Sequence, residues 1–142
     1  MVNAGSTARS TFDASYARLN ERWPAPAETV TLKSDFGSTQ VHVSGPPEAP
    51  ALVLLPAYQA SSAEWIALAR NLNGAFRVFA VDLVGDAGGS TAGIRKIDSP
   101  DDMVAWVDTV LDGLGLSTTQ LGGHSYGAWI AHEYALRRPG RV

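Results

Sequence analysis

The stretch from Leu121 to Ala128 reads LGGHSYGA and places a serine between two glycines at the spacing G-x-S-x-G. A weakly apolar run precedes it and a helical pattern, Ala128 to Arg138, follows, which predicts a strand, a very tight turn and a helix. In such a turn the central side chain stands at the crest of a strained bend, and its neighbours must be small. Gly123, Gly127 and Ala128 supply that room.

The turn points to two groups that can act together in catalysis. It projects the hydroxyl of Ser125 from the C-terminal end of a strand. It also leaves the backbone N–H of Tyr126 at the start of a helix, where the helix dipole favours negative charge. Ser125 is therefore the candidate nucleophile, and Tyr126 is the candidate donor for half of an oxyanion hole. The alternative is a glycine-rich turn that carries a solvated serine.

Three further segments, together with this turn, resemble the α/β-hydrolase family from about Thr29 to the last residue. Leu54–Ser62 (LLPAYQASS) is similar to the family's L-L-H-G-x-x-x-S-S loop after its third strand. Val81–Ser90 (VDLVGDAGGS) is similar to the D-L-P-G-x-G-x-S loop after the fourth strand. Arg138–Val142 resembles the P-x-R-V that follows the nucleophile helix. The resemblance implies a serine hydrolase that acts through an acyl-enzyme, with a small-molecule carboxylic ester or related acyl compound as its substrate.

The resemblance also implies a second oxyanion donor, the backbone N–H of Tyr58 in the loop after the third strand. This chain has Pro56-Ala57 where the family carries His-Gly. Alanine resists the positive φ that glycine adopts readily, so the close approach of the backbone must be achieved in another way. The alternative for this segment is an ordinary strand-to-helix loop.

The pattern of apolar residues predicts an α/β fold. Alternation at Val30–Leu32 and at Val41–Val43, with turn residues between them, predicts an antiparallel hairpin. The unbroken apolar run Ala51–Leu55 predicts a strand that is buried on both faces, and Arg77–Val81 predicts the next strand. A hairpin followed by β-α-β-α-β-α indicates a mostly parallel sheet with helices on both faces.

The N-terminal segment divides into two parts. Residues 1–10 are small and polar, which predicts a disordered tail ahead of a partial α/β-hydrolase domain over residues 11–142. Phe12, Tyr16 and Leu19 lie at i, i+4 and i+7, which predicts a short packing helix that ends at Trp23-Pro24.

Two later helices have recognisable start signals. Ser61 with Glu64 three residues later forms a capping-box signature. Ser99 precedes Pro100 and two acidic residues, an arrangement that suits the positive end of a helix dipole. The predicted buried stripe of this second helix comprises Met103, Trp106, Val107, Val110, Leu111 and Leu114.

Bulk properties exclude several function classes. A length of 142 residues fits one domain, and a net charge of −3 with interspersed signs makes nucleic acid an unsuitable partner. The chain has no cysteine, so disulfide and thiolate chemistry are excluded. No run approaches the ~20 apolar residues of a membrane span and no signal peptide is evident, which predicts a cytoplasmic protein that does not enter a membrane. No metal or other cofactor is predicted, because ligand spacing and phosphate-loop signatures are both missing.

A serine needs a base that accepts its proton, and none of the three histidines fits that role. His42 alternates with two valines and is predicted on the outer face of the hairpin. His124 adjoins Ser125 in sequence, where the turn directs its side chain away from the hydroxyl. His132 lies two turns along the helix, about 10 Å from the reacting atom at 1.5 Å per residue.

The acid and the base of the triad are therefore expected beyond residue 142. In the family the acid and then the histidine follow the serine in the chain. Asp82 and Asp86 precede it, in a loop that shapes the substrate entrance in the family, and we interpret Asp82 as structural.

The resemblance stops about halfway through the family's sheet. We expect the C-terminal half, with the remaining strands, on a separate or missing chain, so that the strand before Ser125 forms an open edge. The alternative function is a non-catalytic or truncated fragment that serves as a binding or assembly module. Acyl transfer, C–C bond hydrolysis and perhydrolysis use the same turn, so the fold does not choose among these reactions.

Overall fold

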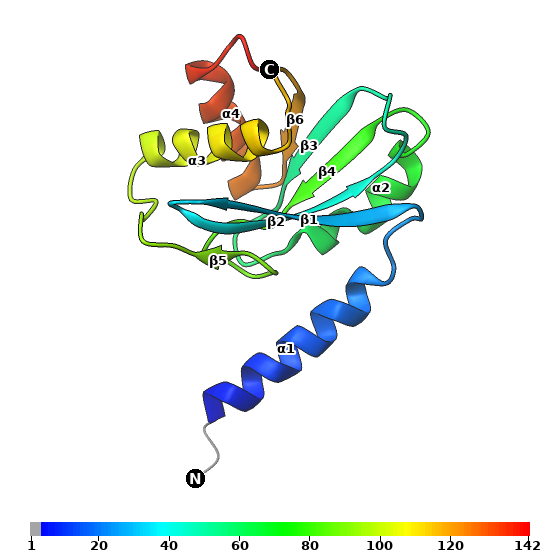
Figure 1. The fold of residues 1–142 in the computed structure, drawn as a ribbon, viewed down its shortest axis with the longest axis vertical. Helices are drawn as coiled ribbons and strands as arrows, with labels where there is room; N and C mark the ends of the chain where they lie inside the picture. The colour runs from blue at the N-terminus through cyan, green and yellow to red at the C-terminus, as the bar shows by residue number, and fades with distance from the viewer. Residues whose placement is uncertain (1–3) are drawn as a thin grey trace.

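A single six-stranded sheet organises the computed structural model, which describes residues 4–142 (Figure 1). The main strand order is β1-β2-β4-β3-β6, and the short β5 pairs with β2. β1, β2 and β4 are joined by antiparallel pairs, whereas β4, β3 and β6 run parallel. The predicted α/β fold is confirmed. The strands are β1 (Ala27–Ser34), β2 (Gly37–Ser44), β3 (Ala51–Leu55), β4 (Arg77–Val81), β5 (Thr91–Ala92) and β6 (Gln120–Gly123).

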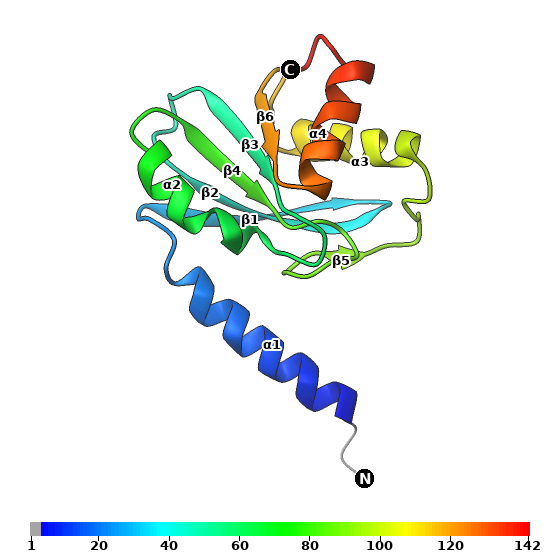
Figure 2. The ribbon, with the colours of Figure 1, turned by 180° about the vertical axis from the view of Figure 1, so that it is seen from behind.

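Helices pack on both faces of this sheet (Figures 1 and 2). α3 and α4 cover one face and share its larger hydrophobic core, while α2 covers the other face. None of the helices within residues 4–142 has the length and hydropathy that crossing a bilayer requires. The helical segments are α1 (Ala4–Asn20), the 3-10 helix η1 (Ser62–Trp65), α2 (Ile66–Leu72), α3 (Pro100–Gly113) and α4 (Tyr126–Arg137).

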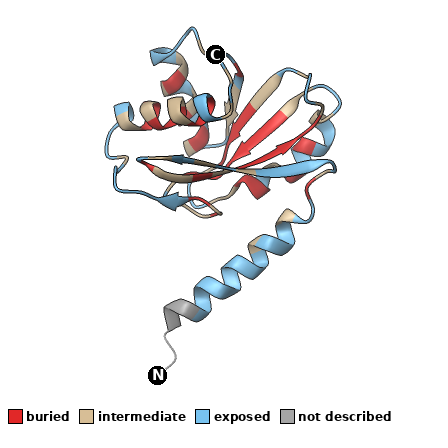
Figure 3. Cartoon of the chain, viewed as in Figure 1, coloured by how far each residue is buried: buried red, intermediate tan, exposed pale blue. Residues whose placement is uncertain are grey.

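The central strands are buried because the side chains of each strand enter the hydrophobic cores on both faces of the sheet. In β4, Phe79 and Val81 belong to the core under α3 and α4, whereas Val78 and Ala80 belong to the core under α2. The buried centre of the sheet is visible in Figure 3. Burial on both faces explains why these strands read as continuous apolar runs in the sequence.

Helix α1 is longer than predicted and extends away from the sheet (Figure 1). Residues 4–10, which the sequence predicts as part of a disordered tail, form its first turns in the structure, while residues 1–3 lie outside the described part. Local interactions support these turns: Arg9 pairs with Asp13 at 3.1 Å, and the Thr11 hydroxyl donates to the Thr7 carbonyl at 2.9 Å. From Thr7 onward most residues of α1 are exposed (Figure 3).

A polar contact from the C-terminal half of α1 and an aromatic contact from the segment that follows it tie this region to the sheet. The Tyr16 hydroxyl lies 3.0 Å from Nε2 of His42 and donates to the Asp82 carboxylate. The Trp23 ring stacks on the His42 imidazole, with the ring centroids 5.2 Å apart. His42 is consequently only 4% exposed. The sequence predicts His42 on the outer face of the hairpin, but this face is not open to solvent at His42. Tyr16 and Trp23, from a preceding segment of the chain, cover it.

Candidate functional site

The chain between β6 and α4 makes the tight turn that the sequence predicts. Ser125 has φ of 51° and ψ of −111°, and its side chain is exposed at the crest. Of the residues that the structure describes, only Ser125 and Gln59 combine a side chain with positive φ. The turn is held on both sides, since His124 N–H donates to the Leu55 carbonyl at 3.1 Å and Trp129 N–H donates to the Ser125 carbonyl at 3.1 Å. The strain is thus concentrated at the serine.

Two glycines make this turn possible. A Cβ on Gly123 would lie 2.2 Å from the carbonyl carbon of Gly127. A Cβ on Gly127 would lie 2.1 Å from the carbonyl oxygen of Leu55. Real side-chain carbons do not approach other atoms this closely, so the spacing around Ser125 is a steric requirement of the contact between β6, α4 and β3.

The polar groups at the crest remain available for a ligand. Ser125 is the N-cap residue of α4, yet its hydroxyl makes no capping hydrogen bond. Tyr126 is the first residue of α4, and the N–H groups of a first helical turn have no acceptor within their own helix. The hydroxyl of Ser125 and the N–H of Tyr126 therefore lie side by side at the positive end of the helix dipole.

The loop from β3 to η1 carries Tyr58 beside this turn. The Tyr58 and Tyr126 rings meet edge to face, with their centroids 6.2 Å apart. The Ala60 N–H donates to the Ala57 carbonyl at 3.1 Å, which closes a turn with Tyr58 and Gln59 at its centre. The positive φ of this loop falls at Gln59 (φ of 59°) and not at Ala57. The loop therefore avoids the conformation that Ala57 resists.

Carboxylates from three positions bind backbone amides of this loop. Glu64 accepts from Ala57 N–H at 3.2 Å, and Asp86 accepts from Gln59 N–H at 2.9 Å. Asp82 accepts from Ser62 N–H at 2.7 Å. Within residues 4–142, the Tyr58 N–H has no hydrogen-bond acceptor. The Tyr58 N–H, the predicted oxyanion donor, is therefore unpaired, whereas the amides of Ala57 and Gln59 on either side of it are bound to carboxylates.

The capping box predicted at Ser61 and Glu64 forms only in part. The Ser61 hydroxyl accepts from Ala63 N–H at 3.4 Å, and the segment begins as the 3-10 helix η1. The Glu64 carboxylate does not reach back to Ser61. It bonds the Ala57 amide and lies 3.5 Å from Nδ1 of His124, so it links the Tyr58 loop to the serine turn.

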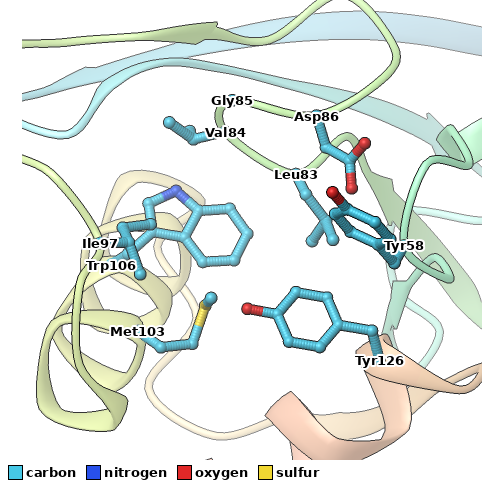
Figure 4. A pocket seen from close by; sticks show the side chains of 9 residues that line it. All are labelled: Tyr58, Leu83, Val84, Gly85, Asp86, Ile97, Met103, Trp106 and Tyr126. Carbon is cyan, nitrogen blue, oxygen red and sulfur yellow. The ribbon is translucent and has the colours of Figure 1, made fainter.

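A small cavity of about 140 Å³ lies between these loops and α3 (Figure 4). Its walls combine apolar side chains, such as Leu83 and Met103, with the polar groups of Tyr58, Asp86 and Tyr126. Burial raises the pKa of the Tyr126 phenol, and the negative charge of Asp86 adds to that rise. The lining residues are Tyr58, Leu83, Val84, Gly85, Asp86, Ile97, Met103, Trp106 and Tyr126.

Asp82 is fully buried and occupies a structural position, in keeping with the sequence interpretation. Besides Ser62 N–H and the Tyr16 hydroxyl, its carboxylate accepts from Gly89 N–H at 2.7 Å. The Ser90 hydroxyl donates to the Asp82 carbonyl at 2.7 Å. Asp82 therefore joins the loops that follow β3 and β4 and is separated from solvent.

The histidines do not supply a base in the described part of the chain. The exposed His124 side chain faces Glu64, and His132 lies beside Glu133 with Nδ1 3.9 Å from Oε1. His42 is enclosed by the end of α1, and burial lowers its pKa. None of these side chains makes a hydrogen bond to Ser125 within residues 4–142.

Sequence reasoning missed the contacts that Glu64 and Asp86 make with the Tyr58 loop. Asp86 lies 27 residues from Gln59, and Glu64 lies seven residues from Ala57. A carboxylate that accepts from a loop amide has no characteristic spacing. The one signal in the sequence was the position of Asp86 in the loop after β4, at the same edge of the sheet as Ser125.

The strand-turn-helix motif around Ser125 and the sheet behind it define an α/β hydrolase. The profile of the family described as "alpha/beta hydrolase fold" matches residues 50–142, and the chain belongs to this family. The resemblance observed in the sequence is confirmed.

Individual relatives extend the match over nearly all of the chain. The carboxylesterase YbfK of Bacillus subtilis is 34% identical over 131 residues, which cover 92% of this chain and 44% of that protein. A second relative from that organism, the uncharacterized carboxylesterase nap, is 33% identical over 134 residues, covering 89% of this chain and 43% of that protein. The chain thus spans somewhat less than half the length of the curated relatives that it matches.

Solved structures show the same correspondence. The crystal structure of YbfK superposes with a TM-score of 0.89 at 34% identity, covering 93% of this chain and 46% of that chain. The crystal structure of naproxen esterase from Bacillus subtilis superposes with a TM-score of 0.86 at 30% identity, covering 92% of this chain and 46% of that chain.

Proposed function

We propose that this chain carries the nucleophile of a hydrolase that acts on small carboxylic esters, with Ser125 at the nucleophile elbow. The observation that carries the proposal is the conformation of Ser125, an exposed side chain held at positive φ with a free hydroxyl at the N-terminus of α4. Carboxylesterases among the relatives support an ester as the substrate. The small size of the cavity beside Tyr126 supports a small acyl or alcohol group.

The reaction has two steps. In the first, Ser125 Oγ attacks the acyl carbon and gives its proton to a base, and the tetrahedral intermediate then expels the alcohol, which takes that proton from the base. In the second, water gives a proton to the base as it attacks the acyl-enzyme, and Ser125 takes this proton from the base as the carboxylic acid leaves. The negative oxygen of each intermediate accepts hydrogen bonds from the N–H groups of Tyr126 and Tyr58. Fixed backbone donors stabilise this charge without reorganisation during the reaction.

The base and the acid that orients it come, in this proposal, from sequence beyond residue 142. Two observations support this assignment. The three histidines of this chain face Glu64, Glu133 and the end of α1 instead of Ser125. The relatives that match are more than twice as long as the matched segment.

A covalent probe tests the proposal on the polypeptide as its source produces it. A fluorophosphonate should label Ser125, and peptide mapping should find the label on no other residue of this chain. Ser125→Ala should abolish both labelling and hydrolysis of a p-nitrophenyl short-chain ester. The matched control is Ser117→Ala, which alters an exposed serine on the loop before β6. Labelling of a different residue, or hydrolysis that survives Ser125→Ala, contradicts the proposal.

A further inference from the structure

The turn that presents Tyr58 has an unusual residue at its third position. The Ala57–Ala60 turn is closed by the hydrogen bond from Ala60 N–H to the Ala57 carbonyl, and Gln59 has φ of 59°. A positive φ at this position is typical of a type II turn, which prefers glycine or asparagine there. Glutamine has a Cβ and resists this conformation, so neighbouring contacts must hold it.

Asp86 makes the contact that holds this conformation. Its Oδ2 accepts from Gln59 N–H at 2.9 Å, and its Oδ1 accepts from Ala87 N–H at 2.7 Å. Both carboxylate oxygens are therefore engaged with backbone amides, and the charge makes these hydrogen bonds stronger than neutral ones. Asp86 lines the cavity together with Tyr58 and Tyr126, so the contact lies at the candidate site (Figure 4).

The turn geometry determines where the Tyr58 N–H points. This N–H and the Ala57 carbonyl belong to one planar trans peptide group, so they point in opposite directions. The bond from Ala60 fixes the carbonyl and thereby fixes the N–H. A type I turn would keep that bond but would flip the Tyr58–Gln59 peptide and turn the Gln59 N–H away from Asp86, so the left-handed conformation of Gln59 keeps this turn joined to the loop after β4. The Gln59 side chain is exposed, so Asp86 stabilises this conformation through the Gln59 backbone N–H.

We propose that Asp86 is a positioning residue for the oxyanion hole: its carboxylate holds the Ala57–Ala60 turn so that the Tyr58 N–H faces the oxygen of the intermediate formed at Ser125. The inference rests on the proposed function, because Tyr58 serves as an oxyanion donor only if Ser125 is the nucleophile. Asp86 does not contact the reacting atoms in this role. It acts on the transition state through the backbone of Gln59.

Steady-state kinetics of two substitutions separates positioning from charge. Asp86→Ala removes the acceptor, and we expect kcat for a p-nitrophenyl short-chain ester to fall about tenfold or more, with KM changing less than about threefold. The complete loss of one oxyanion donor, roughly a hundredfold or more, sets the upper end of the effect. Asp86→Asn keeps one acceptor oxygen, which serves Gln59 N–H when the amide nitrogen faces Ala87 N–H, so kcat should fall less than it does in Asp86→Ala. Glu48→Ala, which removes one exposed charge elsewhere, should have the kcat and KM of the wild type.

The outcomes distinguish this inference from the proposed function. If Ser125→Ala is inactive while Asp86→Ala keeps its wild-type kcat, only the positioning role is overturned. If kcat in Asp86→Asn falls as far as in Asp86→Ala, an acceptor oxygen at this position does not preserve turnover, and the inference is again overturned. If Ser125→Ala retains hydrolysis, the proposed function fails first.

A second pair of variants tests the turn directly and serves where Asp86→Ala does not fold. Gln59→Gly keeps the N–H and accepts positive φ without cost, so kcat should stay within about threefold of wild type. Gln59→Val places a β-branched side chain at positive φ and should lower kcat about tenfold or more. Both substitutions alter the same exposed side chain. Equal kcat values for the two variants overturn the inference.

Discussion

Gly127 packs against Leu55 so closely that a Cβ on the glycine would lie 2.1 Å from the leucine carbonyl oxygen. The helix after Ser125 and the strand before the Tyr58 loop therefore meet backbone to backbone. This contact brings the candidate nucleophile and both candidate oxyanion donors to one edge of the sheet. The site depends on the absence of a side chain at position 127.

The contact predicts that Gly127→Ala destabilises the fold by about 1–3 kcal/mol, the usual cost of overpacking a close contact. Gly140→Ala is the matched control, because a Cβ there would have no heavy atom within 4 Å. This control should change stability by no more than about 0.5 kcal/mol. Urea unfolding followed by tryptophan fluorescence measures the stability of both variants. Equal midpoints for the two variants would contradict the close approach.

Tyr58→Phe should leave ester hydrolysis nearly unchanged. The proposed donor is the backbone N–H, which is present in both residues, and the side chain is exposed. The measurement is kcat/KM for a p-nitrophenyl short-chain ester, with Ser125→Ala as the inactive reference. A loss of roughly a hundredfold, the size expected for an oxyanion donor, would show that the hydroxyl itself takes part.

Tyr16→Phe should loosen α1 from the sheet. The Tyr16 hydroxyl contacts His42 and Gln40 and donates to the Asp82 carboxylate, and its loss leaves these groups, of which His42 and Asp82 are buried, short of a partner. Such a loss costs about 1–3 kcal/mol. Tryptic cleavage at Arg18, measured under native conditions, should then accelerate about tenfold. Ser15→Ala alters the exposed neighbour, and cleavage as fast in this control would show that the hydroxyl does not hold the helix.

His42 should make stability depend on pH. Burial lowers the pKa of its imidazole in the folded state, and the charge of Asp82 offsets part of that shift. The unfolded state therefore binds the proton more readily, with a pKa of about 6.5. Stability from this group is complete above that value and is lost as pH falls from there toward the lower folded pKa.

The comparison that isolates this effect is His42→Gln, which does not titrate. Between about pH 7.5 and about pH 5, the wild-type melting temperature should fall more steeply than that of the variant. Other groups titrate equally in both proteins and cancel in the difference. Parallel curves would show that His42 carries no penalty on protonation.

The sequence alone predicted the local structure of the central strands, because that structure depends on residues that are close together in the chain. The boundaries predicted for Ala51–Leu55 and Arg77–Val81 are those observed for β3 and β4. The predicted N-cap at Ser99 is confirmed by the hydrogen bond from Asp102 N–H to its hydroxyl at 3.1 Å. Apolar runs and caps act over a few residues, so the sequence displays them directly.

The turn at Ser125 was also predictable from residues that are close together in the chain. Only small residues fit where β6 and α4 touch, and the glycine spacing records that steric demand. Residues 4–10, predicted to be disordered, form helical turns in which local contacts such as that of Arg9 with Asp13 add to weak helix-forming signals.

The tertiary structure alone decided the strand order, the burial of His42 and the support of the Tyr58 loop. β4 lies between β2 and β3, although β3 comes first in the chain. Trp23 and Tyr16 cover His42 from a segment whose direction no local pattern specifies. Asp86 meets Gln59 across 27 residues of sequence. Local patterns determine which residues form strands, helices and tight turns, whereas contacts between distant residues exist only after the sheet has assembled and brought its loops to one edge.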